Sequence, residues 1–300
     1  MGTLLFLVYV NDLMDTGCEW KAFADDFKLC AYKDGTDGLN SVIGSLQADL
    51  DSIASRSYSW NLKLNHSKCK VMRFGKGKCN GSGIYHLNGC QLEAVGSYRD
   101  LGVVVDASLK FHMQVREVVR KAGGLVSNLL RTTVCRSGSF MTSLFVSHIR
   151  PILDYCSCVW GTGYLGDLRM LESVQRRWTR EVEGLGRLEY RERLKRMDLY
   201  SVMGRMLRMD LIKVWKAFNS SVDVGLSQLL PLSELVVTRG HQFKLRVQTC
   251  RTENRRRFFS VRVVRQWNAL PSSVVDSVSL AAFKGQLDGY LGDRLFEAPP

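Results

Sequence analysis

The spacing of apolar residues changes at Asp106, and this change constrains the fold more than any other feature of the sequence. Before Asp106, apolar residues occur in short segments, several of which alternate with polar residues as in β-strands. After it, they recur every three to four residues over long stretches, as on one face of an α-helix. We therefore expect an α+β protein with a mixed head at 1–106, a basic helical region at 107–220 and a small C-terminal segment at 221–300.

The head contains one predicted hairpin and one predicted amphipathic helix. Two short apolar pieces within 20–32 flank Asp25 and Asp26, which predicts a β-hairpin with an acidic turn. Residues 38–60 carry apolar side chains at helical spacing. Further short strands are expected at 69–74, 84–87 and 101–105, and residues 4–13 form an apolar segment that is too short to span a bilayer.

The region after Asp106 is dominated by helical periodicity. The predicted helices lie at 111–131, 139–160, 168–182 and 198–218, and Pro151 is expected to begin or kink one of them. Gly225, Pro231 and Gly240 interrupt the pattern, which returns at 258–267 and 280–291.

The positive charge is concentrated in the helical part. Residues 1–100 hold 11 basic and 11 acidic side chains, whereas residues 101–300 hold 31 basic and 18 acidic ones, so the whole excess of +13 lies there. One-sided charge favours a polyanionic partner, either nucleic acid or a membrane surface. The alternative is a basic composition that serves solubility only.

The cysteines indicate the compartment. There are nine of them, an odd number, with no C-x-x-C pair and no secretory signal in the sequence. We therefore expect reduced thiols and no structural zinc, in an intracellular protein of the nucleus or cytoplasm that is neither secreted nor membrane-spanning.

The doubled acid at Asp25 and Asp26 is the sharpest chemical feature. Adjacent carboxylates at a hairpin tip repel each other, and a divalent cation relieves that repulsion. Mg²⁺ prefers such oxygen ligands, and polymerases use a pair of these ions to activate a hydroxyl and stabilise the leaving pyrophosphate. The alternative is an ordinary solvated turn, in which aspartate is common.

A series of segments in a fixed order changes that balance. Together they resemble the reverse transcriptase of LINE-type (non-LTR) retrotransposons, an RNA-directed DNA polymerase (nucleotidyltransferase), from part of its palm to its C-terminal segment. The segments are 2–13, the Phe23-Ala24-Asp25-Asp26 stretch at 23–29, the Leu-Asn-x-x-Lys stretch within 60–75, 98–103, 150–160, 258–271 and 283–284.

The resemblance implies a function and a set of residues. Residues 1–106 would be a partial palm sheet, residues 107–220 a thumb-like region, and the partners an RNA template, a DNA primer or target and deoxynucleoside triphosphates. Asp25 and Asp26 would be catalytic Mg²⁺ ligands, Lys68 would assist the leaving pyrophosphate, and Phe23 would pack under the turn. For Lys68 the alternative is a surface lysine beside a strand.

The sequence also departs from the family. No segment matches its fingers or its third catalytic aspartate, and two carboxylates without a third make a poor two-metal site. We therefore expect this chain by itself to polymerise little or nothing.

Basic residues cluster on the predicted helices, and arginine suits phosphate contact. We expect these residues to bind nucleic acid with little sequence preference and a steep dependence on salt, the alternative being solvated helix faces. Trp178 and Trp215 could stack on bases, but we expect them to be buried in the bundle. The basic candidates are Arg169, Arg176, Arg177, Arg180, Arg205, Arg208, Lys213, Arg255, Arg256 and Arg257.

Three functions remain open at this point: a fragment of a reverse transcriptase, a nucleic-acid-binding module without catalysis, and an unselected remnant of a mobile element.

Overall fold

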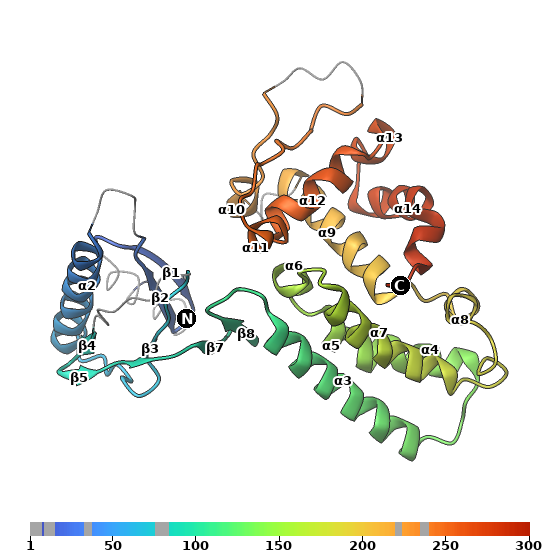
Figure 1. The fold of residues 1–300 in the computed structure, drawn as a ribbon, viewed down its shortest axis with the longest axis horizontal. Helices are drawn as coiled ribbons and strands as arrows, with labels where there is room; N and C mark the ends of the chain where they lie inside the picture. Colours follow the sequence, from blue (N-terminus) through green and yellow to red (C-terminus); the bar gives the residue numbers. More distant parts are fainter. Residues whose placement is uncertain (1–7, 9–15, 33–37, 76–83, 220–223, 235–239) are drawn as a thin grey trace. The chain divides into compact units, whose positions relative to one another are not determined.

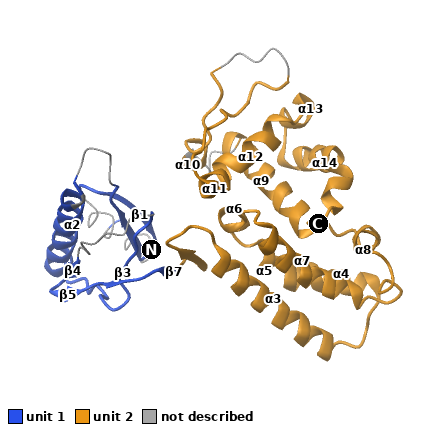
Figure 2. Cartoon of the chain, in the orientation of Figure 1, with its two compact units in different colours: residues 1–98 blue, residues 99–300 orange. Residues whose placement is uncertain are grey.

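The chain divides into two compact units, unit 1 at 1–98 and unit 2 at 99–300 (Figure 2). The structure, a computed structural model, describes residues 8, 16–32, 38–75, 84–219, 224–234 and 240–300. The helical region 107–220 and the C-terminal segment 221–300 therefore belong to one compact unit. The predicted apolar segment 4–13 lies outside the described residues, apart from Val8.

Helix α2 (Leu39–Ser59) is the longest element of unit 1 and confirms the amphipathic helix predicted at 38–60 (Figure 1). The described strands of this unit are β1 (Glu19–Phe23), β2 (Asp26–Cys30), β3 (Lys70–Val71), β4 (His86–Leu87), β5 (Cys90–Gln91) and β6 (Glu93–Ala94), with β7 (Ser97–Asp100) at its boundary.

Two small apolar clusters form the core of unit 1, and α2 contributes to both. Ile53 of α2 packs with Trp20 and Phe27 of the hairpin β1–β2. Leu50 of α2 packs in a second cluster that contains the buried Leu87 of β4. Each strand pair thus buries its apolar face against the same helix.

The described strands pair only two by two: β1 with β2, β3 with β6, β4 with β5, and β7 with β8 (Val103–Asp106). The single palm-like sheet that we expected within 1–106 is therefore not formed by the described residues. Strands β3 to β6 are two residues long each, which leaves little backbone for further pairing. Their apolar surface is covered by α2 rather than by neighbouring strands.

Unit 2 is mainly helical (Figure 1). After β8 its elements are α3 (His112–Thr132), α4 (Gly138–Leu144), the π-helix η2 (Phe145–Ile149), α5 (Arg150–Asp154), α6 (Ser157–Trp160), α7 (Leu165–Arg180), α8 (Tyr190–Arg196), α9 (Val202–Asn219), α10 (Val224–Ser227), α11 (Glu253–Arg256), α12 (Phe259–Asn268), α13 (Ser272–Val275), α14 (Leu280–Leu291) and the 3₁₀ helix η4 (Gly292–Phe296). The helices predicted at 111–131, 168–182, 198–218, 258–267 and 280–291 are confirmed within a few residues.

The stretch predicted as one helix at 139–160 is divided into four parts. Pro151 lies in the first turn of α5, directly after the π-helix, where a residue without an N–H group is tolerated. Cys156 then adopts a φ of 52°, in the left-handed region, and separates α5 from α6. The prediction that Pro151 begins or kinks a helix is confirmed.

Helix α9 joins the two hydrophobic cores of unit 2. Its first half contributes Val202 and Met206 to a core shared with α3, α5 and α7. Its second half contributes Leu211 and Val214 to a core shared with α12 and α14. This continuous helix explains why the C-terminal segment packs as part of the same unit.

Among the described helices, none combines the length and the apolar character that crossing a bilayer requires.

Candidate nucleic-acid interface and acidic hairpin

The predicted acidic hairpin is confirmed. Strands β1 and β2 pair from Glu19 opposite Cys30 to Phe23 opposite Asp26, which leaves Ala24 and Asp25 as the turn. Ala24 adopts a φ of 53°. Two-residue hairpin turns require a positive φ at this position, and a residue other than glycine rarely adopts it.

Asp25 and Asp26 lie exposed at the apex of the hairpin. Phe23 is also exposed, with 64% of its surface open to solvent, so it does not pack under the turn as we expected. Alternation along the strand is the reason, because Trp20 and its cross-strand partner Leu29 occupy the face that packs on α2. Phe23 is an odd number of residues from Trp20 and therefore belongs to the opposite face.

Lys68 lies in a turn after Asn65, and its backbone N–H donates to the Asn65 carbonyl at 3.1 Å. Its carbonyl accepts from the Tyr98 hydroxyl at 3.4 Å, and the residue is exposed. Within the described part of unit 1, no hydrogen bond or ion pair joins Lys68 to Asp25 or Asp26.

The described residues do not make a complete magnesium site. They contain no group of three or more histidine, cysteine, aspartate or glutamate side chains arranged to hold a metal ion. Two exposed carboxylates at a turn supply oxygen ligands of the right kind, but a two-metal site needs further ligands and a shaped, dry surrounding. We therefore assign no catalytic step to this hairpin.

Helices α3 and α7 pack side by side in unit 2 and run in the same direction. At their starts, the Asp167 carboxylate lies 2.8 Å from Nδ1 of His112, and further along Arg177 Nη1 donates to the Ser127 hydroxyl at 3.0 Å. On α7, Arg176 and Arg180 are exposed, as is Arg177. None of these three guanidinium groups pairs with a carboxylate within the described ranges.

Helix α3 adds arginines that the sequence analysis missed. Arg116, Arg120 and Arg131 are exposed and share one stripe with Ser127, because the intervals between them are four, seven and four residues. That helical spacing was the signal in the sequence. Arg131 lies one turn beyond Ser127, so the stripe of α3 meets Arg177 of α7. We call the following residues the α3–α7 surface: Arg116, Arg120, Ser127 and Arg131 of α3, and Arg169, Arg176, Arg177 and Arg180 of α7.

Arg169 is exposed near the start of α7, and its Nε donates to the Pro300 carbonyl at 2.6 Å. The Arg176 guanidinium lies 4.7 Å from the ring centroid of Tyr190, which holds it in place while leaving it accessible. Glu117 of α3 pairs with Arg99 at 2.8 Å and lies 3.6 Å from Arg120. The end of the surface near Arg131 and Arg180 is therefore the more strongly positive one.

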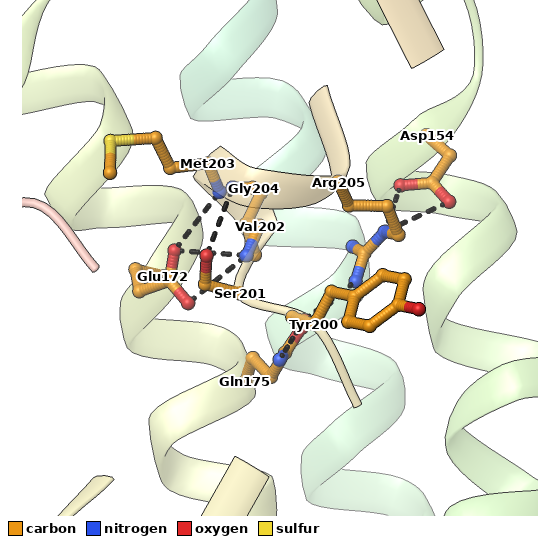
Figure 3. A network of polar contacts seen from close by, with 9 residues as sticks. All are labelled: Asp154, Glu172, Gln175, Tyr200, Ser201, Val202, Met203, Gly204 and Arg205. Atoms are coloured by element: carbon orange, nitrogen blue, oxygen red, sulfur yellow. Dashed lines mark hydrogen bonds and ion pairs between the residues drawn. The ribbon is translucent and has the colours of Figure 1, made fainter. Parts of the chain in front are cut away.

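Arg205 does not reach the surface. It is 5% exposed, and its Nε donates to the two carboxylate oxygens of Asp154 at 2.8 and 3.1 Å (Figure 3). Its Nη1 donates to Gln175 at 3.2 Å. Arg208 is half-buried and makes a two-pronged pair with Asp288, at 2.5 and 2.9 Å. The expectation that Arg205 and Arg208 contact phosphate is corrected, because carboxylates inside unit 2 already occupy both groups.

The same region contains a buried carboxylate at the start of α9. Glu172 is 1% exposed and accepts the backbone N–H groups of Val202 at 3.1 Å and Met203 at 3.4 Å (Figure 3). The Tyr190 hydroxyl also donates to it. Burial raises the pKa of Glu172. A carboxylate at a helix start satisfies N–H groups that lack helical partners, so this network fixes α9 on α7.

Trp178 and Trp215 are buried, as we expected. The indole N–H of Trp178 donates to the Met141 carbonyl at 3.1 Å, and that of Trp215 donates to the Val275 carbonyl at 3.2 Å. Neither ring offers a free face to a base.

The arginines of α11 and the residue after it differ in exposure. Arg255 and Arg256 are exposed, whereas Arg257 is half-buried. The Arg257 guanidinium lies 4.0 Å from the ring centroid of Tyr164 and pairs with Glu253 at 2.8 Å. Lys213 is half-buried on α9. Of these four basic residues, Arg255 and Arg256 are therefore the ones most accessible to a nucleic acid.

Comparison with known proteins points to one kind of relative. The chain is 23% identical to the RNA-directed DNA polymerase from mobile element jockey of Drosophila melanogaster, over 195 residues that cover 61% of this chain and 21% of the relative. The chain is similar to a retrotransposon polymerase. The Drosophila funebris counterpart is 20% identical over 193 residues, again 61% of this chain and 21% of the relative. No family model and no solved structure matches the chain.

The matched part thus spans about a fifth of the length of these relatives. The similarity confirms the resemblance to a reverse transcriptase in its coarse form.

Proposed function

We propose that this chain is part of a LINE-type RNA-directed DNA polymerase that binds nucleic acid through the α3–α7 surface. Residues 1–106 correspond in this proposal to a part of the palm that carries the Ala24-Asp25-Asp26 hairpin. Residues 107–220 correspond to a thumb-like region, and 221–300 to the segment that follows it. The similarity to the jockey polymerases and the confirmed acidic hairpin support this assignment.

One observation carries the binding proposal: two helices that run side by side present adjoining stripes of arginine. Phosphates of a polynucleotide recur at regular intervals, and arginine contacts them in two-pronged fashion. Arg131, Arg176 and Arg180 are exposed and make no ion pair with a described carboxylate. A polyanion can bind these arginines without breaking ion pairs inside the protein.

The test is binding of a labelled single-stranded RNA, and of an RNA–DNA hybrid, over a series of salt concentrations. The double variant Arg176→Gln/Arg180→Gln should lower the slope of log K against log salt by about 1.4 for the single strand, since each lost phosphate contact contributes about 0.7. The matched control is Arg196→Gln/Arg294→Gln, which removes two exposed arginines outside the surface. Equal loss of slope in both double variants would contradict the assignment to α3 and α7.

We propose that this chain by itself has little or no polymerase activity, although the jockey relatives are named RNA-directed DNA polymerases. The two carboxylates at the hairpin apex lack a third metal-binding partner within the described residues. The assay is extension of a DNA primer on an RNA template with deoxynucleoside triphosphates and either Mg²⁺ or Mn²⁺. Clear extension that Asp25→Ala abolishes would refute this point.

The second candidate is a nucleic-acid-binding module without catalysis. It shares with the first candidate the expectation of salt-dependent binding and of absent extension by this chain, and clear extension would exclude it. Binding that is flat between low and moderate salt contradicts both candidates.

A further inference from the structure

Unit 2 contains a groove with a volume of about 1030 Å³, which is lined by α6, α9, α10, α11 and α12, by the residues just before α3 and by the chain after α10. Apolar side chains make up most of it, among them Val159, Leu229, Pro231, Val247, Phe258 and Phe259. Its lining shares no residue with the α3–α7 surface, and the proposed function makes no use of it.

Three aliphatic side chains of the groove are strongly exposed. Val247 is 69% exposed, Leu229 60% and Val159 52%. They come from three separate segments, so the fold gathers them at one place. Contiguous exposed apolar side chains rimmed by polar groups mark an interaction surface.

The charged residues that line the groove are all basic. They are Lys213, Arg246 and Arg255, and the described lining contains no acidic residue. Arg255 is held in place, because its Nη2 donates to Gln248 at 3.0 Å and its guanidinium lies 5.6 Å from the ring centroid of Phe258. The occupant that fits this lining is apolar on the side that enters the groove and acidic along the edges.

We propose that the groove docks a helical segment of a partner protein, with aliphatic residues on one face and Asp or Glu on both sides of that face. An amphipathic helix presents such anchors at positions i, i+3 or i+4, and i+7. Charge complementarity selects acidic flanks over basic ones.

The aromatic residues favour a peptide over a nucleic-acid strand. Bases bind by stacking on free aromatic faces. Here guanidinium groups lie near the available rings, Arg255 near Phe258 and Arg262 at 5.7 Å from the centroid of Phe259. The third ring of the lining, Phe111, is only 5% exposed. The freely exposed part of the groove is aliphatic, which suits side chains of a helix.

The test uses the full chain and a labelled amphipathic peptide of roughly 14 residues, about four helical turns, with leucine on one face and glutamate flanks. A scrambled peptide of the same composition keeps the charge and loses the face. We expect the amphipathic peptide to bind at least about tenfold more tightly than the scrambled one, because only it buries its leucines together. Equal binding of the two peptides overturns the proposal.

Groove variants locate the binding. Leu229→Asp and Val247→Asp change exposed side chains and should each weaken the amphipathic peptide about tenfold or more. Val278→Asp, at a residue that is 98% exposed and not part of the lining, is the matched control and should leave binding unchanged. Arg246→Glu should weaken the glutamate peptide and strengthen a version with lysine flanks.

Two other results also overturn the proposal. One is that Val247→Asp abolishes single-stranded DNA binding while peptide binding persists, which makes the groove a nucleic-acid site. The other is that Val247→Asp dissociates a dimer of the chain in sedimentation, which makes a second copy the occupant.

Discussion

Replacement of Arg205 by methionine tests whether the α9 arginines belong to the interior or to a nucleic-acid surface. Arg205 is 5% exposed and donates to Asp154 and Gln175. Methionine fills a similar space but leaves the Asp154 carboxylate, which has a side-chain exposure of 20%, without its arginine. Removing one partner of a buried ion pair costs about 3–5 kcal/mol, because the remaining charge is desolvated and unpaired.

The assay is thermal unfolding of the full chain followed by far-ultraviolet circular dichroism. Unit 2 covers residues 99–300, and for a unit of this size 1 kcal/mol corresponds to roughly 2–4 °C. The expected fall in Tm of the transition from unit 2 is therefore roughly 6–20 °C. The matched control is Arg176→Met, at an exposed arginine that contacts the Tyr190 ring, which should change the free energy of unfolding by no more than about 1 kcal/mol.

For nucleic-acid binding, Arg176→Met should have the larger effect and Arg205→Met the smaller one. Arg176→Met should reduce the salt slope for a single strand by about 0.7, and Arg205→Met, measured well below its Tm, should leave it unchanged. A stable Arg205→Met protein with a reduced salt slope would refute the reasoning, because Arg205 would then face the nucleic acid rather than Asp154.

The remaining predictions concern packing and pH in unit 2. Gly204→Ala should destabilise the unit by about 1–3 kcal/mol in urea unfolding, since the new Cβ would lie 2.4 Å from the Leu295 carbonyl oxygen. Gly285→Ala in α14 is its control and should stabilise by about 0.4–1 kcal/mol, because nothing lies within 4 Å of the new Cβ. His241 is buried, and burial lowers its pKa below the ordinary 6.5, while its Nε2 lies 3.2 Å from the Trp267 carbonyl. As pH falls below about 6.5, the unfolded state therefore binds a proton at His241 before the folded state does, so the free energy of unfolding should fall over that range. His241→Gln should flatten this dependence in unfolding curves measured from pH 7 to pH 5. An unchanged pH dependence in this variant would contradict the assignment of the effect to His241.

Local periodicity predicted most of the helices and the hairpin. Helices α2, α3, α7, α9, α12 and α14 and the pair β1–β2 lie where the spacing of apolar residues indicated. This works because a helix or strand buries one face, and that face leaves its period in the chain. The division of 139–160 was partly visible through Pro151, whereas the left-handed Cys156 carried no sequence signal.

The sequence by itself determined most of the long helices, the acidic turn at Asp25 and Asp26, and the concentration of positive charge after residue 100. Only the tertiary structure decided which of those positive charges face solvent. Arg176 and Arg205 look alike in the sequence, but Asp154 reaches the second from 51 residues away and turns it into an interior ion pair. The packing of helices determines which groups lie next to a buried charge. Such contacts join segments that are far apart in the chain, so no local spacing of residues in the sequence indicates them.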